Sequence, residues 1–224
     1  MNQEISVLFL TAAVLGFIHT ILGPDHYIPF IVMSKAGKWS KIKTVWITIL
    51  SGIGHVLSSV VLGFIGIGFG IALHEVVAIE SSRGEIASWL MIAFGLVYFV
   101  WGMRRAIKKK KHYHFHSDSA SHNHDKPHQM VNLTPWIIFT IFVFGPCEVL
   151  IPLLMYPAAQ QSITGLVLVT LVFGTTTIST MLTIVLLGSY GIEFIRLGRI
   201  ERYSHALAGL FIFLSGSAIQ FLGL

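Results

Sequence analysis

The chain has 224 residues, of which 54% are hydrophobic and 11% are charged, against about 25% charged residues in an ordinary soluble domain. So few charged side chains cannot cover a water-soluble globule, and several apolar stretches exceed the roughly 20 residues that cross a hydrocarbon core. The net charge of +5 comes from short basic clusters between apolar stretches, which indicate membrane topology rather than nucleic-acid binding. We therefore expect a protein that binds the lipid bilayer and no nucleic acid.

Apolar length predicts six transmembrane helices. Their ranges are 7–33, 45–73, 86–103, 135–156, 163–190 and 205–222. Lysine and arginine cluster in the connections after the first, third and fifth spans, whereas the other two connections hold only Arg83. Because cytoplasmic connections carry the excess of Lys and Arg, the sequence predicts a multi-pass protein of the cytoplasmic membrane with both termini outside.

The two halves of the chain repeat one another. A shift of 122 residues aligns Gly23-Pro24 with Gly145-Pro146, Gly52 with Gly174 and Gly66 with Gly188, and a shift of 114 aligns 95–102 with 209–216. Three spans per half reverse the direction of the second half, as in many secondary transporters. The predicted fold is an all-α integral membrane protein of two inverted three-helix repeats, 1–103 and 135–224, joined by a cytoplasmic loop, 104–134.

Each repeat begins with a span that contains a Gly-Pro pair beside ionisable residues. The first span carries His19, Gly23, Pro24, Asp25 and His26, and the fourth carries Gly145, Pro146, Cys147 and Glu148. Proline removes a backbone donor and interrupts the helix, and paired broken helices at corresponding positions point to a transporter binding site. We expect breaks in the first and fourth helices, with the ionisable side chains at the breaks.

Imidazole, carboxylate and thiolate together form the ligand set of a divalent transition metal rather than of magnesium. Ionisable residues inside the bilayer are costly and are a functional site by default. The predicted metal site comprises His19, Asp25, His26, His55, Cys147 and Glu148. Several of them could instead have a purely structural role, since a lone histidine can be a packing residue and a free cysteine is usually a small buried hydrophobe.

The loop between the repeats is rich in histidine. It contains His112, His114, His116, His122, His124 and His128, six of the eleven histidines in the chain. Tracts of this composition are commonly metal-binding, although the loop could also be a solvated linker. We expect it to capture metal as an accessory to the site in the membrane.

In these motifs and in its two three-helix halves, the chain resembles the nickel/cobalt transporter group of the LysE-like superfamily, including the NicO-type and UreH-like proteins. The resemblance implies a role in metal selection for His19, Asp25 and His26. The permease motif usually holds two aspartates, whereas this chain has Gly23-Pro24-Asp25-His26, so Glu148 is the candidate for the second carboxylate. Nickel or cobalt would be the substrate; no prosthetic group and no enzymatic reaction are implied.

Three rival functions remain open. The CcdA-like thiol electron carriers are distant relatives in the same superfamily, but their chemistry needs a cysteine in each repeat, and Asp25 stands where the first would be. A second rival is an exporter of a small anion such as sulfite, received at the helix breaks. A third is an accessory membrane protein that hands metal to a cytoplasmic metallochaperone or metalloenzyme maturation factor.

Overall fold

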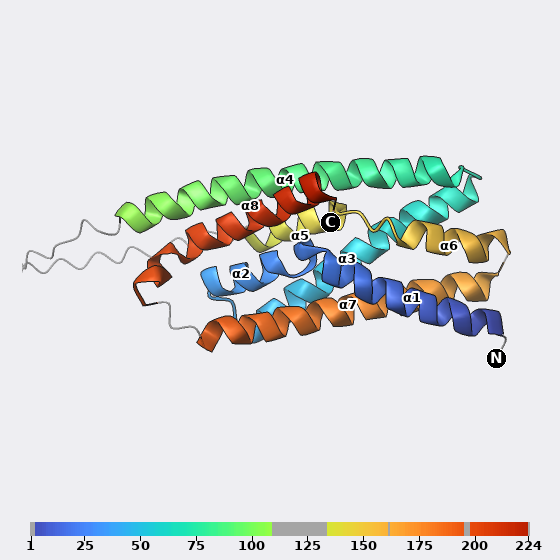
Figure 1. Ribbon diagram of the computed structural model, residues 1–224, viewed down its shortest axis with the longest axis horizontal. Coiled ribbons are helices and arrows are strands. Elements are labelled where there is room, and N and C mark those ends of the chain that lie inside the picture. Colours follow the sequence, from blue (N-terminus) through green and yellow to red (C-terminus); the bar gives the residue numbers. More distant parts are fainter. Residues whose placement is uncertain (1–2, 109–133, 161, 195–197, 224) are drawn as a thin grey trace, which may run out of the picture.

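The computed structural model describes residues 3–108, 134–160, 162–194 and 198–223, and within these ranges the chain is helical and contains no strand. In chain order the elements are α1 (Gln3–Leu22), η1 (Pro24–His26), α2 (Ile28–Ala36), α3 (Lys41–Gly68), α4 (Leu73–Lys108), α5 (Thr134–Phe144), α6 (Leu150–Ala159), α7 (Ile163–Phe194), η3 (Gly198–Tyr203) and α8 (Ser204–Leu222). They form one elongated bundle in which α8 lies along α4 and α1 lies along α7 (Figure 1). The six loop histidines fall outside the described residues.

Among the described residues, five helices are long and apolar enough to cross a membrane: α1, α3, α4, α7 and α8. Two shorter apolar helices, α5 and α6, follow one another in the fourth predicted span. The observed helices thus confirm a multi-pass, all-helical membrane protein. Within the described residues, five single helices, rather than the six expected from the sequence, are each long enough to span a membrane.

The chain leaves the helical path at both Gly-Pro pairs. In the first, α1 ends at Leu22, Gly23 is extended at φ −86° and ψ 99°, and one turn of 3₁₀ helix precedes α2. In the second, α5 ends at Phe144 and α6 begins at Leu150. Because proline cannot donate a backbone hydrogen bond, each pair interrupts the helix where the sequence predicts a break.

The third predicted span, 86–103, is too short. Helix α4 begins at Leu73, so the stretch from 74 to 85 that the sequence assigns to a connection is helical. It contains Glu80 and Arg83, which lower the hydropathy of the segment but form an ion pair with each other three residues apart. A paired charge is tolerated inside a helical bundle where a lone charge is not, and hydropathy alone does not detect the pairing.

Helices α4 and α8 touch through glycines at reciprocal positions. A Cβ at Gly95 would lie 2.4 Å from the backbone nitrogen of Phe213, and one at Gly209 would lie 2.2 Å from that of Phe99. Gly102 meets Ala206 as Gly216 meets Ile92, in a second pair of matching contacts. Small residues allow membrane helices to approach closely, and here no side chain larger than hydrogen fits.

The basic helix ends gather at one end of the bundle. The ends of α4 and α7 and the start of α8 lie together at the left of Figure 1, opposite the start of α1. Lys35 in the last turn of α2, Arg105 and Lys108 in the last turn of α4, and Arg202 before α8 carry this charge. The described parts of the segments that the sequence assigns to the cytoplasmic side therefore lie at one end of the bundle.

Candidate metal centre

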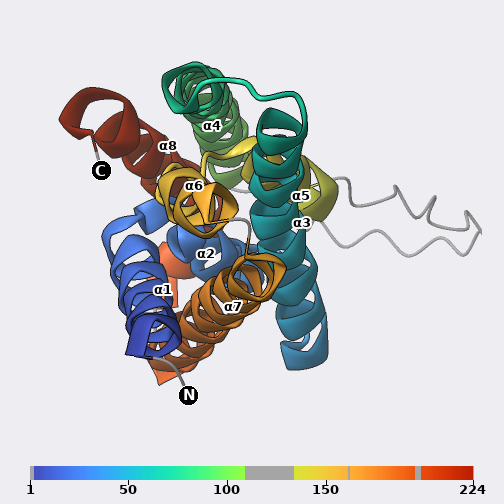
Figure 2. The same ribbon diagram turned by 90° about the vertical axis from the view of Figure 1, so that its right-hand side faces the viewer.

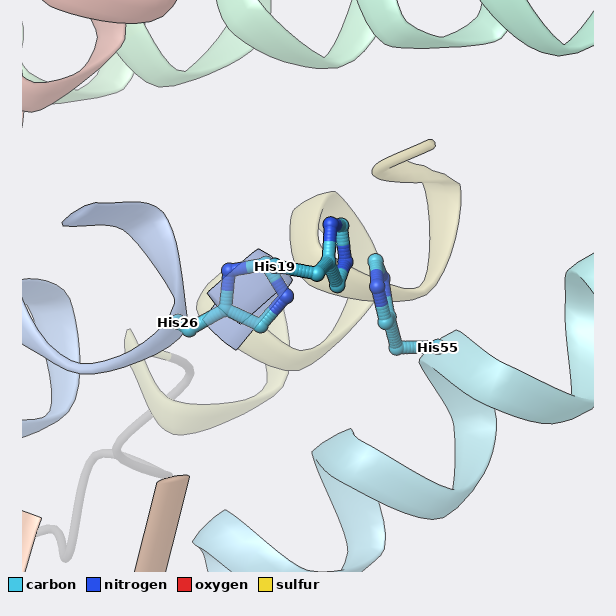
Figure 3. Close-up of side chains that lie close together, drawn as sticks. All are labelled: His19, His26 and His55. Atoms are coloured by element: carbon cyan, nitrogen blue, oxygen red, sulfur yellow. The ribbon is translucent and has the colours of Figure 1, made fainter. Parts of the chain in front are cut away.

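Three histidines from separate parts of the chain converge inside the bundle. His19 lies near the end of α1, His26 closes η1, and His55 lies in the middle of α3; one ligand nitrogen from each falls within 4.8 Å of the other two. Their ring centroids are 4.7 Å apart for His19 and His26, and 5.0 Å apart for His26 and His55 (Figure 3). His26 is 2% exposed and His55 is fully buried.

Two of these rings are oriented by oxygen acceptors on Nδ1. His26 Nδ1 lies 3.0 Å from Asp25 Oδ1 and 3.2 Å from the Gly23 carbonyl oxygen, and His55 Nδ1 lies 3.2 Å from the Phe142 carbonyl oxygen. Both Nε2 atoms are buried and have no hydrogen-bond partner among the residues that the structure describes. A proton held on Nδ1 leaves the lone pair on Nε2, which is how metal-binding histidines are prepared.

The second Gly-Pro pair explains how His55 finds its acceptor. In a continuous helix the Phe142 carbonyl would accept from residue 146, which is proline and has no N–H. The carbonyl accepts instead from the Gly145 backbone N–H at 3.0 Å and lies 3.2 Å from His55 Nδ1. The Phe142 ring also stacks on the His55 ring, with centroids 4.6 Å apart. The hydrogen bond and the stacking together hold the His55 ring in place beside the break.

Cys147 and Asp25 lie next to the three histidines. The Sγ atom of Cys147 is 3.7 Å from His19 Nε2, and the residue is fully buried. Asp25 holds His26 through its carboxylate and is partly exposed, with 15% of its side chain accessible. A thiol and a carboxylate at these positions extend the donor set from three nitrogens to nitrogen, sulfur and oxygen.

The structure separates Glu148 from this cluster. Its side chain is exposed, and it lines a cavity of about 550 Å³ to which His19, Asp25 and His26 also contribute. The sequence predicts Glu148 as a direct ligand because it aligns with His26 in the repeat. In this conformation the three histidines gather without it.

A buried ion pair holds the second break, and the sequence analysis missed it. Glu80 is fully buried and its Oε1 accepts the Cys147 backbone N–H at 2.8 Å and the Ser59 hydroxyl. Arg83 donates to Glu80 Oε2 at 2.6 Å and to the Val143 carbonyl oxygen at 3.1 Å. In an unbroken helix the Cys147 N–H would donate to the Val143 carbonyl. Here the Cys147 N–H donates to Glu80 and the Val143 carbonyl accepts from Arg83, so the ion pair replaces that backbone hydrogen bond.

One sequence signal could have identified this ion pair. Glu80 and Arg83 are spaced so that they share a helix face, and intramembrane charges are expected to pair with one another or with backbone carbonyls. Charges in a connecting loop would be solvated and would need no partner, whereas the same charges within a helix of the bundle must pair.

The model of one protein family, described as cytochrome C biogenesis protein transmembrane region, matches residues 28–218. The chain belongs to this family. No curated protein and no solved structure matches the chain. The family match supports a membrane protein of the CcdA-like kind, the more distant resemblance seen in the sequence, and gives no support to the nickel/cobalt transporter group.

Within the cytochrome C biogenesis transmembrane region family, the matched range covers His55, the Glu80–Arg83 pair and Cys147, and it begins after His19, Asp25 and His26. The chain has a single cysteine. Two cysteines are needed for a disulfide within one chain. Any thiol exchange by Cys147 would therefore require a thiol from another molecule.

Proposed function

We propose that the protein binds a divalent transition metal, nickel or cobalt, at His19, His26 and His55 and carries it across the membrane. The convergence of three imidazoles, two of them buried with Nε2 atoms that have no partner among the described residues, carries this proposal. A buried polar atom without a partner is costly, and metal coordination would satisfy both atoms at once. The Cys147 thiol and the Asp25 carboxylate complete a donor set of imidazole, sulfur and oxygen.

The donor chemistry favours a transition-metal cation as substrate. Imidazoles suit nickel, copper, zinc and iron, whereas magnesium and calcium prefer sites built from oxygen. The Asp25 carboxylate would offset part of the charge of a divalent ion. A small anion is the weaker candidate because the cavity beside the cluster is lined by carboxylates and, among its described residues, by no Lys or Arg.

Two inverted repeats around this site would provide alternating access. Reciprocal contacts support the repeat: with a shift of 114, the Gly95–Phe213 contact maps onto Gly209–Phe99. With the shift of 122 the Gly52–Ile178 contact maps onto Gly174–Val56. In each case the two partners trade places when the shift is applied, as expected for two repeats related by a pseudo-two-fold axis. The two Gly-Pro breaks would lie on either side of that axis. In this arrangement α1 with α2, and α5 with α6, each count as one interrupted span.

The proposed orientation follows the basic residues. The helix ends gathered at the left of Figure 1 would face the cytoplasm, and the histidine-rich loop after α4 would lie on that side. There it could pass metal to a cytoplasmic metallochaperone or metalloenzyme maturation factor.

Isothermal titration tests the site. Nickel, cobalt, zinc and sulfite are titrated into purified protein in which alanine replaces the six loop histidines, so that exposed imidazoles do not contribute. We expect one equivalent of metal, and no measurable binding after His26→Ala or His55→Ala. His74→Ala is the matched control, because His74 is exposed at the start of α4.

If metal still binds after His26→Ala and after His55→Ala, the ion does not bind at the proposed site. Sulfite binding without metal binding would instead establish the anion exporter. Metal entry into liposomes that contain the protein separates transport from delivery, since an accessory protein would bind metal but give no flux.

Thiol exchange is the second candidate, because the family is described by cytochrome c biogenesis and Cys147 lies beside an imidazole. Histidine can activate a neighbouring thiol. Against this candidate, the Sγ belongs to a fully buried residue, which a partner's thiol cannot reach in this conformation. Cys147→Ser distinguishes the two: thiol exchange would be abolished, whereas metal binding would weaken and persist through the three histidines.

A further inference from the structure

A cavity of about 550 Å³ lies beside the histidine cluster, between α1, α4, the break that precedes α6 and the end of α8. His19 and His26 form part of its wall, and its other polar residues include Glu85, Glu148 and Gln220. Figure 2 looks along the bundle from the end at which α1 begins and shows these four helices together. The cavity therefore connects the buried imidazoles with exposed acidic side chains.

The cavity is polar toward the cluster and negative along its wall. Asp25, Glu85 and Glu148 contribute three carboxylates, and none of the described lining residues is Lys or Arg. His26, which also lines the cavity, is 2% exposed and has an Nε2 atom without a partner. Carboxylates in a cleft with low-dielectric walls concentrate cations and repel anions.

Away from the cavity, the cluster packs against apolar side chains. Phe142 packs against both His26 and His55, with ring centroids 5.3 Å and 4.6 Å apart. It belongs to a buried cluster with Phe30, Met33 and Met181 that continues toward the basic helix ends through residues such as Ala36 at the end of α2.

We infer that the cavity is the aqueous entrance through which a hydrated divalent cation reaches the histidines, and that Glu85 and Glu148 capture the cation there. The inference rests on the metal site proposed above. Gly223 lines the cavity and follows the end of α8 that is remote from Arg202. The entrance therefore opens away from the basic helix ends.

The capture step is tested by the rate of metal binding. Stopped-flow mixing with Ni²⁺ in low salt uses the protein in which alanine replaces the six loop histidines, and compares this protein with its Glu85→Gln/Glu148→Gln and Glu75→Gln variants. We expect association about tenfold slower in the double variant, with the difference shrinking as salt is added. The control Glu75 is exposed at the start of α4 and does not line the cavity. Equal rates in all three proteins would overturn the capture role.

The direction of the entrance is tested by labelling with a membrane-impermeant maleimide in sealed vesicles. Ser81→Cys places a thiol on the cavity wall, and Lys43→Cys places one at the basic end of α3. Wild type is the blank, because Cys147 is fully buried. We expect Ser81→Cys and Lys43→Cys to react from opposite sides, and Ni²⁺ at the cluster to slow labelling of Ser81→Cys.

Labelling of both cysteines from the same side would contradict the inferred entrance. These outcomes are separable from failure of the metal site itself. If Ni²⁺ binds at His26 and His55 and the glutamate variants bind it at unaltered rates, the proposed metal site stands and the proposed entrance is refuted. A protein that binds no metal loses both.

Discussion

The two helix breaks carry the same Gly-Pro pair but satisfy their backbone groups in different ways. At the first break the neighbouring residues do so: the His26 N–H donates to the Gly23 carbonyl at 3.1 Å, and the Tyr27 hydroxyl donates to the Ile21 carbonyl at 3.2 Å. The second break also has local bonds, such as Gly145 N–H to the Phe142 carbonyl, but in addition it takes partners from α3 and α4, through His55, Ser58, Glu80 and Arg83.

This difference separates two tasks. The first break is locally satisfied, which leaves His26 and its neighbour Asp25 directed toward the site. The backbone groups of the second break take hydrogen-bond partners from other helices. These same hydrogen bonds orient His55 and hold Cys147 beside the site. One break thus supplies ligands, whereas the other positions ligands that belong to its neighbours.

The largest expected effect comes from removing the cation at the second break. Arg83→Met leaves Glu80 buried without its partner, which costs about 3–5 kcal/mol in other proteins. We expect the free energy of unfolding to fall by about that amount, measured in detergent by denaturant titration. At the first break the carboxylate of Asp25 pairs with the His26 imidazole rather than with a guanidinium and is partly exposed, so Asp25→Asn should destabilise the fold far less.

The double variant Glu80→Gln/Arg83→Met sharpens this prediction. It removes both charges, and the stability should recover part of the loss, since no uncompensated charge is then left buried. A double variant that is less stable than Arg83→Met would contradict the account of the ion pair.

An intermediate effect is expected from restoring a backbone donor at the second break. Pro146→Ala supplies an N–H that can compete for the Phe142 carbonyl, so His55 would lose its orientation. Loss of such an outer partner typically lowers metal affinity about 10- to 100-fold, and titration with Ni²⁺ measures it.

The matched control is Pro135→Ala at the start of α5, where the first backbone N–H groups of a helix have no partner within the helix. It should bind Ni²⁺ as the wild type does. If Pro146→Ala binds metal equally well, the His55 ring is not held by the break.

The smallest effect should arise at the first break. Tyr27→Phe removes one hydrogen bond to the Ile21 carbonyl and should lower the free energy of unfolding by about 1 kcal/mol. Metal affinity should be unchanged, because Asp25 and Gly23 still hold His26. A change in affinity with unchanged stability would show that the first break is not satisfied locally.

The sequence predicts the local features of this fold well. Gly-Pro pairs interrupt helices through chemistry that belongs to the pair itself, and the repeated glycines mark close helix contacts that the structure contains at Gly95 and Gly209. Convergence of His55 with His19 and His26 is a matter of tertiary packing, and the sequence offers only their shared chemistry as a clue.

Two features were beyond the sequence patterns for physical reasons. The Glu80–Arg83 pair lowers local hydropathy, so a length-and-hydropathy rule ends the span at residue 86, although α4 begins at Leu73. Glu148 aligns with His26 under the repeat shift, yet the two positions differ in burial because the second break turns differently from the first.

X-ray absorption of the nickel-loaded protein, with the six loop histidines replaced by alanine, tests the metal centre most directly. We predict imidazole scattering from three histidines, which falls by one ring in His55→Ala and is unchanged in His74→Ala. A spectrum with only oxygen ligands, or one that His55→Ala leaves unaltered, would contradict a metal centre at His19, His26 and His55.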